Sequence, residues 1–421
     1  MTHLFDRRKF LRASAAMAAG IALPSALLAA CARAATTAGS GPAAPGATGA
    51  SGITWPMDDD HLPVPSGLEP EKDATLKIYQ YREYLSKRVL DDFERKYREL
   101  GVRVETESFR YIQEAIDTIT RDGSDFDVFF PTIDTLGRLA TTNVLAPLNH
   151  DYLPNIKNLW PQLQPPDGPA YDVGLRYSTP YTVFTTGIGW RSDLVPRSHA
   201  PDRLDNPYDV FWDPELMGKV GLYDDYREVL GMALLHDGNA DLGTADPAVL
   251  DRARASLTEM VEVSGARMSY EGAYEGLPEG EFAVHQAWSG DMIYGVYYAK
   301  EGGDDFKHLR YWWPEDGRGV IGVDLMAIPT QGKNPVLAHL FLNHLLDYEV
   351  AMNNFAWNGY QPPLEGAGRE DLAASKWGKL VPPALMNAIA QPEDLETGSM
   401  LLGLDPATDQ AWRNAWPTSS Y

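Results

Sequence analysis

Residues 75–131 read TLKIYQYREYLSKRVLDDFERKYRELGVRVETESFRYIQEAIDTITRDGSDFDVFFP. Short apolar or aromatic runs alternate here with amphipathic stretches that have the spacing of helices. Strands are expected at 76–79, 102–104 and 126–130, and helices at 87–100 and 112–121. This alternation predicts an α/β fold with a mostly parallel sheet that helices cover on both faces.

The α/β pattern continues along the rest of the chain. Further strands are expected at 187–190, 218–223, 283–288 and 323–328, and further helices at 228–236 and 335–354. The 421 residues are too many for one compact core, so two domains are expected. Ligands of such sheets bind at the carboxyl ends of strands, so the segments after Tyr79 and Phe130 are the first candidates for a site.

The first thirty residues have the layout of a twin-arginine export signal. Arg7 and Arg8 precede an apolar, alanine-rich run over 13–30. The sequence Leu-Ala-Ala-Cys at 28–31 resembles the lipobox of bacterial lipoproteins, which predicts lipidation of Cys31. The alternative is a plain signal peptide with a buried cysteine. No later stretch approaches the roughly 18 apolar residues that a spanning helix needs.

Cys31 is the only cysteine, so a disulfide within the chain is excluded. Residues 31–73 are expected to be a lipidated flexible tether, because Thr, Gly, Ala, Ser and Pro dominate as far as about residue 54 and cannot bury a core. Crossings between two lobes are expected near residues 180, 290 and 333. Lobe 1 then comprises 74–180 and 290–333, and lobe 2 comprises 181–289 and 334–421.

The composition favours a small cationic ligand. The net charge is −23, and removal of residues 1–30, which carry a net +3, leaves −26. Such a charge repels nucleic acid and anionic lipid, or serves only solubility outside the cell. The 11 Trp and 21 Tyr exceed the needs of a core, and such rings commonly line sugar or organic-cation sites. Catalytic and metal-binding motifs are missing from the sequence, so no enzyme, metal or cofactor is expected.

Aromatic residues and carboxylates recur together at the expected strand ends. They are Tyr81 with Tyr84, Thr132 with Asp134, Asp225 with Glu228, Trp288 with Asp291, and Asp324. A polyamine is a methylene chain with an ammonium group at each end, so its site needs carboxylates at both ends and aromatic walls between them.

At these residues the chain resembles the periplasmic spermidine/putrescine-binding proteins of ABC importers. The matching stretches, spread from about residue 74 to 365, are IYQYREY (78–84), FDVFFPT (126–132), DDYREV through AL (224–234), AWSGD (287–291), DLMAIP (324–329) and NGYQPP (358–363). The resemblance implies a two-lobed, type II periplasmic-binding-protein (Venus-flytrap) fold that closes over its ligand. It also implies delivery of a polyamine to an ABC permease. Together with the export signal and the lipobox at Cys31, it predicts an exported, lipid-anchored monomer in the periplasm or on the outer face of the cytoplasmic membrane.

The resemblance also implies a role for each site residue. The aromatic walls are Tyr81, Tyr84 and Trp288, and Asp291 lies beside Trp288. The polar lining is Thr132 and Asp134. The ammonium partners are Asp225, Glu228 and Asp324, and Tyr360 is a further ligand-binding residue. The chain departs from the family at Gln80-Tyr81, where a Trp-containing pair is usual, and at Val323 and Asp134, where rings are common. These residues therefore still predict a site for a cation, but they do not identify which amine binds.

Structural interpretations compete with these roles. Asp225 and Glu228 have the spacing of a helix capping box. Trp288 also fits an ordinary core, and Tyr81 and Tyr84 fit the cover of a helix entrance. Asp324, with apolar neighbours, is the strongest candidate, because a buried carboxylate without a cationic partner is costly.

Other functions compete as well. Tyr297 and Tyr298 fit a ferric-iron site, and the aromatic content fits a sugar. An amino acid would need Arg82 or Arg227 to pair with its carboxylate. A secreted hydrolase would need an acid pair, either Asp225 with Glu228 or Asp291 with Asp324. His339 and His344 lie five residues apart on one expected helix and are expected to be solvated.

Overall fold

The computed structural model describes residues 53–57, 60–298 and 305–416. Nine strands in these residues form one sheet in the order β2-β1-β3-β9-β4-β7-β5-β6, with β8 paired to β4. The strands are β1 (Thr75–Tyr81), β2 (Arg103–Phe109), β3 (Val128–Phe129), β4 (Ser178–Arg191), β5 (Val220–Leu222), β6 (Arg267–Met268), β7 (Val284–Trp288), β8 (Leu309–Trp312) and β9 (Val320–Ala327). Each strand predicted from the sequence overlaps one of them.

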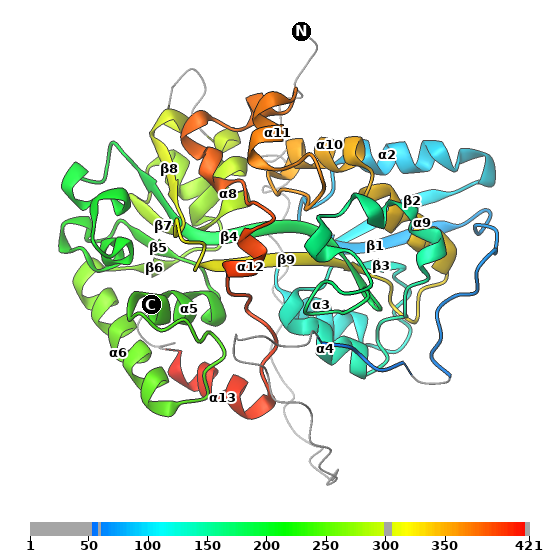
Figure 1. The fold of residues 1–421 in the computed structure, drawn as a ribbon, viewed down its shortest axis with the longest axis horizontal. Coiled ribbons are helices and arrows are strands. Elements are labelled where there is room, and N and C mark those ends of the chain that lie inside the picture. Colours follow the sequence, from blue (N-terminus) through cyan, green and yellow to red (C-terminus); the bar gives the residue numbers. More distant parts are fainter. Residues whose placement is uncertain (1–52, 58–59, 299–304, 417–421) are drawn as a thin grey trace, which may run out of the picture. The chain divides into compact units, whose positions relative to one another are not determined.

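The sheet is parallel at both ends and antiparallel in the middle. β1 pairs in parallel with β2 and β3, and β5 pairs in parallel with β6 and β7. The long strands β4 and β9 run antiparallel to each other through the middle (Figure 1). The α/β class is confirmed. Local alternation of strands and helices did not predict the antiparallel middle, because β4 and β9 are separated by more than a hundred residues.

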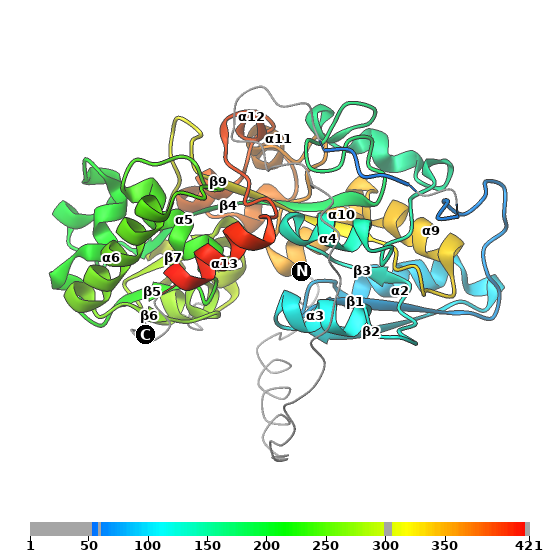
Figure 2. The ribbon, with the colours of Figure 1, turned by 90° about the horizontal axis from the view of Figure 1, so that it is seen from below.

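Helices accompany both ends of the sheet. They are α2 (Lys87–Lys96), α3 (Ile112–Ile119), α4 (Ile133–Thr141), α5 (Tyr226–His236), α6 (Pro247–Ser264), α7 (Leu277–Glu279), α8 (Ser289–Tyr294), α9 (Pro335–Leu345), α10 (Tyr348–Asn358), α11 (Arg369–Ala374), α12 (Asp394–Thr397) and α13 (Pro406–Ala415). In Figure 2, α5 and α6 lie near β5 to β7, whereas α2, α3 and α9 lie near β1 to β3. No helix among the described residues is long and apolar enough to cross a membrane.

The single helix predicted at 335–354 is two helices, α9 and α10. Asp347 separates them, because its side chain accepts hydrogen bonds from the backbone N–H groups of Glu349 (3.1 Å) and Val350 (3.2 Å) and so starts a new helix. The prediction that His339 and His344 are solvated is also wrong. Both rings are buried because this face of α9 packs into the core.

The buried hydrophobic residues form two clusters. Cluster 1 takes its members mainly from β1, β3, β9, α2, α9 and α10, and cluster 2 mainly from β5, α5, α6 and α13. Phe341 of α9, for example, packs edge-on against Phe93 of α2 with ring centroids 5.0 Å apart. The lobe boundaries stay a prediction, and this packing favours moving residues 335–358 from lobe 2 to lobe 1.

Residues 53–57 and 60–73, which we call the N-terminal strap, lie against the folded domain. The backbone N–H of Ile53 donates to the carbonyl of Ala170 (2.7 Å), and the carboxylate of Glu71 accepts from two N–H groups at the start of α9 (2.9 and 3.1 Å). Trp55 lies on Gly137 of α4, where a Cβ atom would be 2.5 Å from the indole ring. The tether predicted over 31–73 is therefore wrong for the strap. The signal segment, Cys31 and the rest of the tether lie outside the described residues.

Candidate functional site

Most of the predicted site residues lie where strands end. Tyr81 is the last residue of β1, Trp288 is the last residue of β7, and Thr132 follows β3. Asp324 lies inside β9, and an isolated antiparallel bridge pairs it with Thr132. The bridge places the segment after β3 beside the buried Asp324 in the middle of the sheet.

Asp324 is a buried carboxylate that is held by two hydroxyl groups. Thr182 is its cross-strand partner in the β4–β9 pairing, and the Thr182 hydroxyl donates to Oδ2 (3.3 Å). The Tyr84 hydroxyl donates to the same oxygen. Burial raises the pKa of Asp324 to about 6, although both hydrogen bonds oppose the shift. A cation nearby would favour the ionised form.

The Asp291 carboxylate accepts hydrogen bonds from two tyrosine side chains. Tyr223 donates to its Oδ2 and Tyr360 to its Oδ1, each at 2.7 Å. Burial raises the pKa of Asp291 to about 7, against the effect of these hydrogen bonds. Sequence reasoning missed Tyr223, although its position between the end of β5 and the Asp224-Asp225 pair was a signal that could have identified it.

Trp288 forms an aromatic wall with rings from three other segments. Tyr223 stacks on it with ring centroids 3.9 Å apart and an interplanar angle of 17°. Phe184 and Tyr270 meet it edge-on at 6.0 and 6.1 Å. Phe184 and Tyr270 were not predicted, because β4 and the segment after β6 reach the site only through the folded sheet. The contacts favour a wall over the ordinary core interpretation of Trp288, which is partly exposed.

Asp225 and Glu228 share one helix start but have different contacts. Asp225 caps α5 by accepting the backbone N–H groups of Arg227 (2.9 Å) and Glu228 (3.1 Å), as the capping interpretation predicts. Glu228 does not complete a capping box. Its Oε1 accepts instead from the Trp288 indole (2.9 Å) and from the Thr186 hydroxyl (3.2 Å).

Glu228 has one buried carboxylate oxygen without a hydrogen-bond partner among the described residues. The side chain is only 6 % exposed, and no group among the described residues donates a hydrogen bond to Oε2. Burial raises the pKa of Glu228 to about 8, and the negative charge of Asp225 adds to the shift. A buried, unpaired acceptor costs free energy until a donor arrives.

Asp134 places a further negative charge near this part of the site. It lies in the first turn of α4, two residues after the helix-capping position Thr132. Burial raises the pKa of Asp225 and of Asp324, and the charge of Asp134 raises both further. Gly403 lies against the backbone of Asp134, where a Cβ atom would be 2.6 Å from its carbonyl oxygen.

Three tyrosines continue the aromatic lining. Tyr81 meets Tyr84 edge-on at 5.5 Å and packs on Phe109, its partner in the β1–β2 pairing, at 4.4 Å. Tyr360 meets Tyr84 and Phe184 edge-on, each at 6.1 Å. The structure thus brings the ten predicted residues into one neighbourhood, and their contact with a ligand stays a prediction.

The competing sites find less support. The Arg227 guanidinium donates to the carbonyls of Leu402 (3.0 Å) and Leu242 (3.2 Å) and lies over the Trp412 ring, so it is already engaged. Among the described residues, no group of three or more His, Cys, Asp or Glu side chains is arranged to hold a metal ion. The side chains of Tyr297 and Tyr298 lie outside the described part of the chain.

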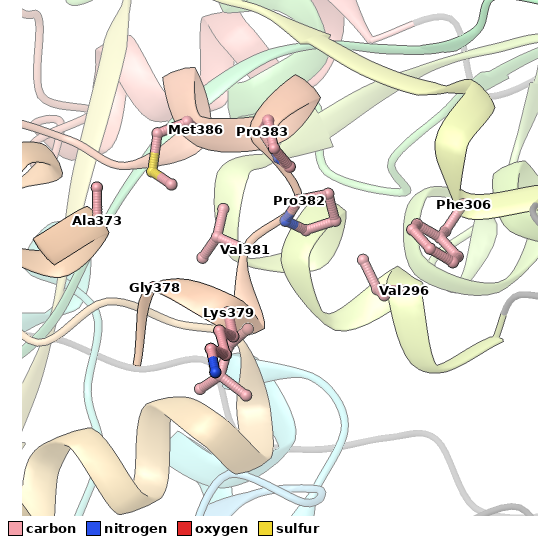
Figure 3. Close-up of a pocket in the computed structure, with 10 residues that line it drawn as sticks. Val296, Phe306, Ala373, Gly378, Lys379, Val381, Pro382, Pro383 and Met386 are labelled. Atoms are coloured by element: carbon pink, nitrogen blue, oxygen red, sulfur yellow. The ribbon is translucent and has the colours of Figure 1, made fainter. Parts of the chain in front are cut away.

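A separate apolar groove of about 720 Å³ contains none of the predicted residues (Figure 3). Val296, Phe306, Pro382, Pro383 and Met386 line it. Its lining includes the cationic Lys379 and no carboxylate. These side chains do not fit a cationic ligand.

The raised pKa of Glu228 predicts a pH effect on the empty protein. A carboxyl whose pKa is raised on folding contributes stability that is fully present below its unfolded pKa and is lost as pH rises through the folded value. Between pH 6.5 and 8, we therefore expect the free energy of unfolding to fall by up to roughly 2 kcal/mol. Urea unfolding of the wild type and of Glu228→Gln at both pH values measures the effect. If the free energy of unfolding changes with pH by the same amount in the wild type and in Glu228→Gln, the prediction is wrong.

Comparison with known proteins places the chain in a family. A family model described as bacterial extracellular solute-binding protein matches residues 88–380. Spermidine/putrescine-binding periplasmic protein 1 of Haemophilus influenzae is 29% identical over 280 residues, which are 66% of this chain and 72% of the relative. The spermidine/putrescine-binding periplasmic protein of Escherichia coli is 28% identical over 335 residues, 79% of this chain and 87% of the relative.

Solved structures show the same fold. The spermidine/putrescine ABC transporter substrate-binding protein PotD of Streptococcus pneumoniae superposes with a TM-score of 0.65 at 23% identity, covering 81% of this chain and 97% of that one. The TpPotD lipoprotein of Treponema pallidum gives a TM-score of 0.68 at 20% identity, covering 82% and 99%. The periplasmic-binding-protein fold expected from the sequence is therefore confirmed, and the chain belongs to the bacterial extracellular solute-binding protein family.

Proposed function

We propose that this protein binds a polyamine of the putrescine or spermidine class and delivers it to an ABC permease. The observation that carries the proposal is the pairing of buried carboxyl groups with aromatic walls, above all Glu228, whose Oε2 has no donor among the described residues. The ammonium group of an amine would supply that donor.

The rest of the site fits a cationic chain. Asp324 and Glu228 provide separate carboxyl groups, which accept hydrogen bonds from Tyr84 and Trp288. Tyr360 meets Tyr84 edge-on. Aromatic faces attract an ammonium group by about 0.5–2 kcal/mol per contact and also cover methylene groups. The names of the relatives, which are spermidine/putrescine-binding periplasmic proteins, agree with this chemistry.

The proposal includes the cellular setting. We infer that the chain is exported and works as a monomer, without catalysis, in the periplasm or on the outer face of the cytoplasmic membrane. A lipid on Cys31 would anchor it there. The relatives named above as periplasmic, and a structural neighbour that is a lipoprotein, support this setting.

Calorimetric titration of the full chain with putrescine, spermidine, spermine, agmatine and a neutral sugar tests the proposal. One-to-one binding of an amine with no heat from the sugar is the expected result. Binding of the sugar alone, or of no amine, would contradict the proposed ligand class.

Replacement of Trp288 by alanine is expected to weaken amine binding about tenfold or more. The variant loses the cation–π attraction and the hydrogen bond from the indole to Glu228. Titration of Trp288→Ala beside Trp288→Phe separates the two contributions, because phenylalanine keeps a ring but not the donor. An affinity of Trp288→Ala equal to that of the wild type would contradict the role of this ring.

A further inference from the structure

Two segments from opposite ends of the sheet meet beside the candidate site. β2 and β6 are the end strands of the sheet order, and six strands lie between them. Arg110 and Tyr111 directly follow β2, and Tyr270 and Glu271 come shortly after β6. Contacts between these residues therefore join parts of the molecule that the sheet itself keeps apart.

The contacts combine charge and aromatic packing. The Arg110 guanidinium donates to the Glu271 carboxylate at 2.5 Å. The same guanidinium lies over the Tyr111 ring at 5.4 Å and over the Tyr270 ring at 5.5 Å. Tyr111 and Tyr270 also meet edge-on at 6.0 Å. One cation thus holds three partners from two distant segments.

Both segments adjoin walls of the candidate site. Arg110 follows Phe109, whose ring packs on Tyr81. Tyr270 meets Trp288 edge-on. The negative charges of Asp291 and Asp324 also reach Tyr270, whose pKa is raised above its usual value first by burial and then by these charges. The contact between the segments consequently lies beside the rings that the proposed ligand would touch.

We infer that Arg110, Tyr111, Tyr270 and Glu271 form a latch across the site that slows release of the bound ligand. This inference rests on the proposed function, since it concerns how long the same site holds its ligand. The ligand can leave only when the segments after β2 and β6 separate, so the ion pair and the ring contacts must break first. Because Arg110 and Glu271 are paired, the latch also neutralises a positive charge that would repel a cation.

The latch residues are partly exposed, so a moderate effect on release is expected. The Arg110 and Glu271 side chains are 41% and 38% exposed. Ion pairs at such positions and cation–π contacts each stabilise a structure weakly. Loss of the Arg110 side chain is therefore expected to speed ligand dissociation roughly three- to tenfold.

Stopped-flow dissociation of putrescine or spermidine, followed by tryptophan fluorescence, tests the latch in the full chain. Arg110→Ala and Glu271→Ala should both release ligand faster, and the exchanged pair Arg110→Glu with Glu271→Arg should recover part of the slow rate. The matched control is Arg267→Ala with Glu281→Ala, which removes an ion pair of 2.7 Å formed within one end of the sheet. A dissociation rate for Arg110→Ala within twofold of the wild type, or no recovery in the exchanged pair, would overturn the inference.

A second measurement needs no ligand. Spin labels on Glu99→Cys and Ala255→Cys, two exposed positions on η1 (Arg98–Leu100) and α6, report the distance between the two ends of the sheet once Cys31 is replaced by serine. Arg110→Ala should shift this distance distribution to longer values in the empty protein. If no amine binds but the shift occurs, the ligand assignment fails and the latch stands. If amines bind and neither rate nor distance changes, the latch fails alone.

Discussion

Replacement of Asp324 by asparagine is expected to weaken binding of putrescine or spermidine at least about 100-fold. The carboxylate is 9% exposed and lies inside β9, so it meets an ammonium group in an environment with little water. Removal of one partner from a buried charge pair costs about 3–5 kcal/mol, which corresponds to two orders of magnitude or more in affinity. Calorimetric titration at pH 8 measures the loss.

The folded structure should tolerate this change. Asparagine has the shape of aspartate and can still accept the hydrogen bonds of Tyr84 and Thr182 through its carbonyl oxygen. The matched control is Asp251→Asn on the exposed face of α6, which should bind like the wild type. If Asp324→Asn binds within tenfold of the wild type while its unfolding midpoint is unchanged, the ammonium partner lies elsewhere.

Amine affinity is expected to fall by up to about 100-fold when the pH is lowered from 8 to 6. Burial raises the pKa of Glu228 to about 8 in the empty site, so below that pH a proton must leave before the carboxylate can pair with an ammonium group. Each pH unit below the pKa of one such group costs up to about tenfold in affinity. Alkyl ammonium groups stay charged over this range, since their pKa is near that of lysine.

The Glu228→Gln variant tests whether the Glu228 carboxyl causes this pH dependence of the amine affinity. The variant should bind more weakly than the wild type at pH 8, and its affinity should depend less on pH. Titration in buffers with different ionisation enthalpies also counts the protons released when the amine binds, and the count should be smaller for the variant. A pH dependence equal to that of the wild type would assign the proton to another carboxyl, such as Asp291, whose pKa burial raises to about 7.

The sequence predicts the parts of the site that a single segment defines. Tyr81 at the end of β1 and Trp288 at the end of β7 can be located because a strand pattern ends at or near these residues. Tyr270 and Phe184 cannot be located in this way, because only the pairing of distant strands brings them to Trp288. Thr182 is found only through its register with Asp324, which lies 142 residues away.

Asp225 and Glu228 show a second limit of local reasoning. A capping box and a pair of ligand-binding carboxylates have the same three-residue spacing, so the pattern predicts both equally. The contacts that separate the two interpretations come from Trp288 and Thr186, on β7 and β4. The fold class could be predicted because the periodicity of each strand and helix is a local pattern, and many such patterns occur along the chain.

The N-terminal strap shortens the linker between a lipid anchor at Cys31 and the folded domain. If Cys31 carries the lipid, attachment at Ile53 leaves 21 residues between anchor and domain, whereas attachment at Ala74 would leave 42. At about 3.5 Å per residue these lengths reach at most about 75 and 150 Å. Because a lipid anchor diffuses in the membrane, the shorter reach confines the domain to a layer about half as thick, so its concentration at a permease in the same membrane rises about twofold.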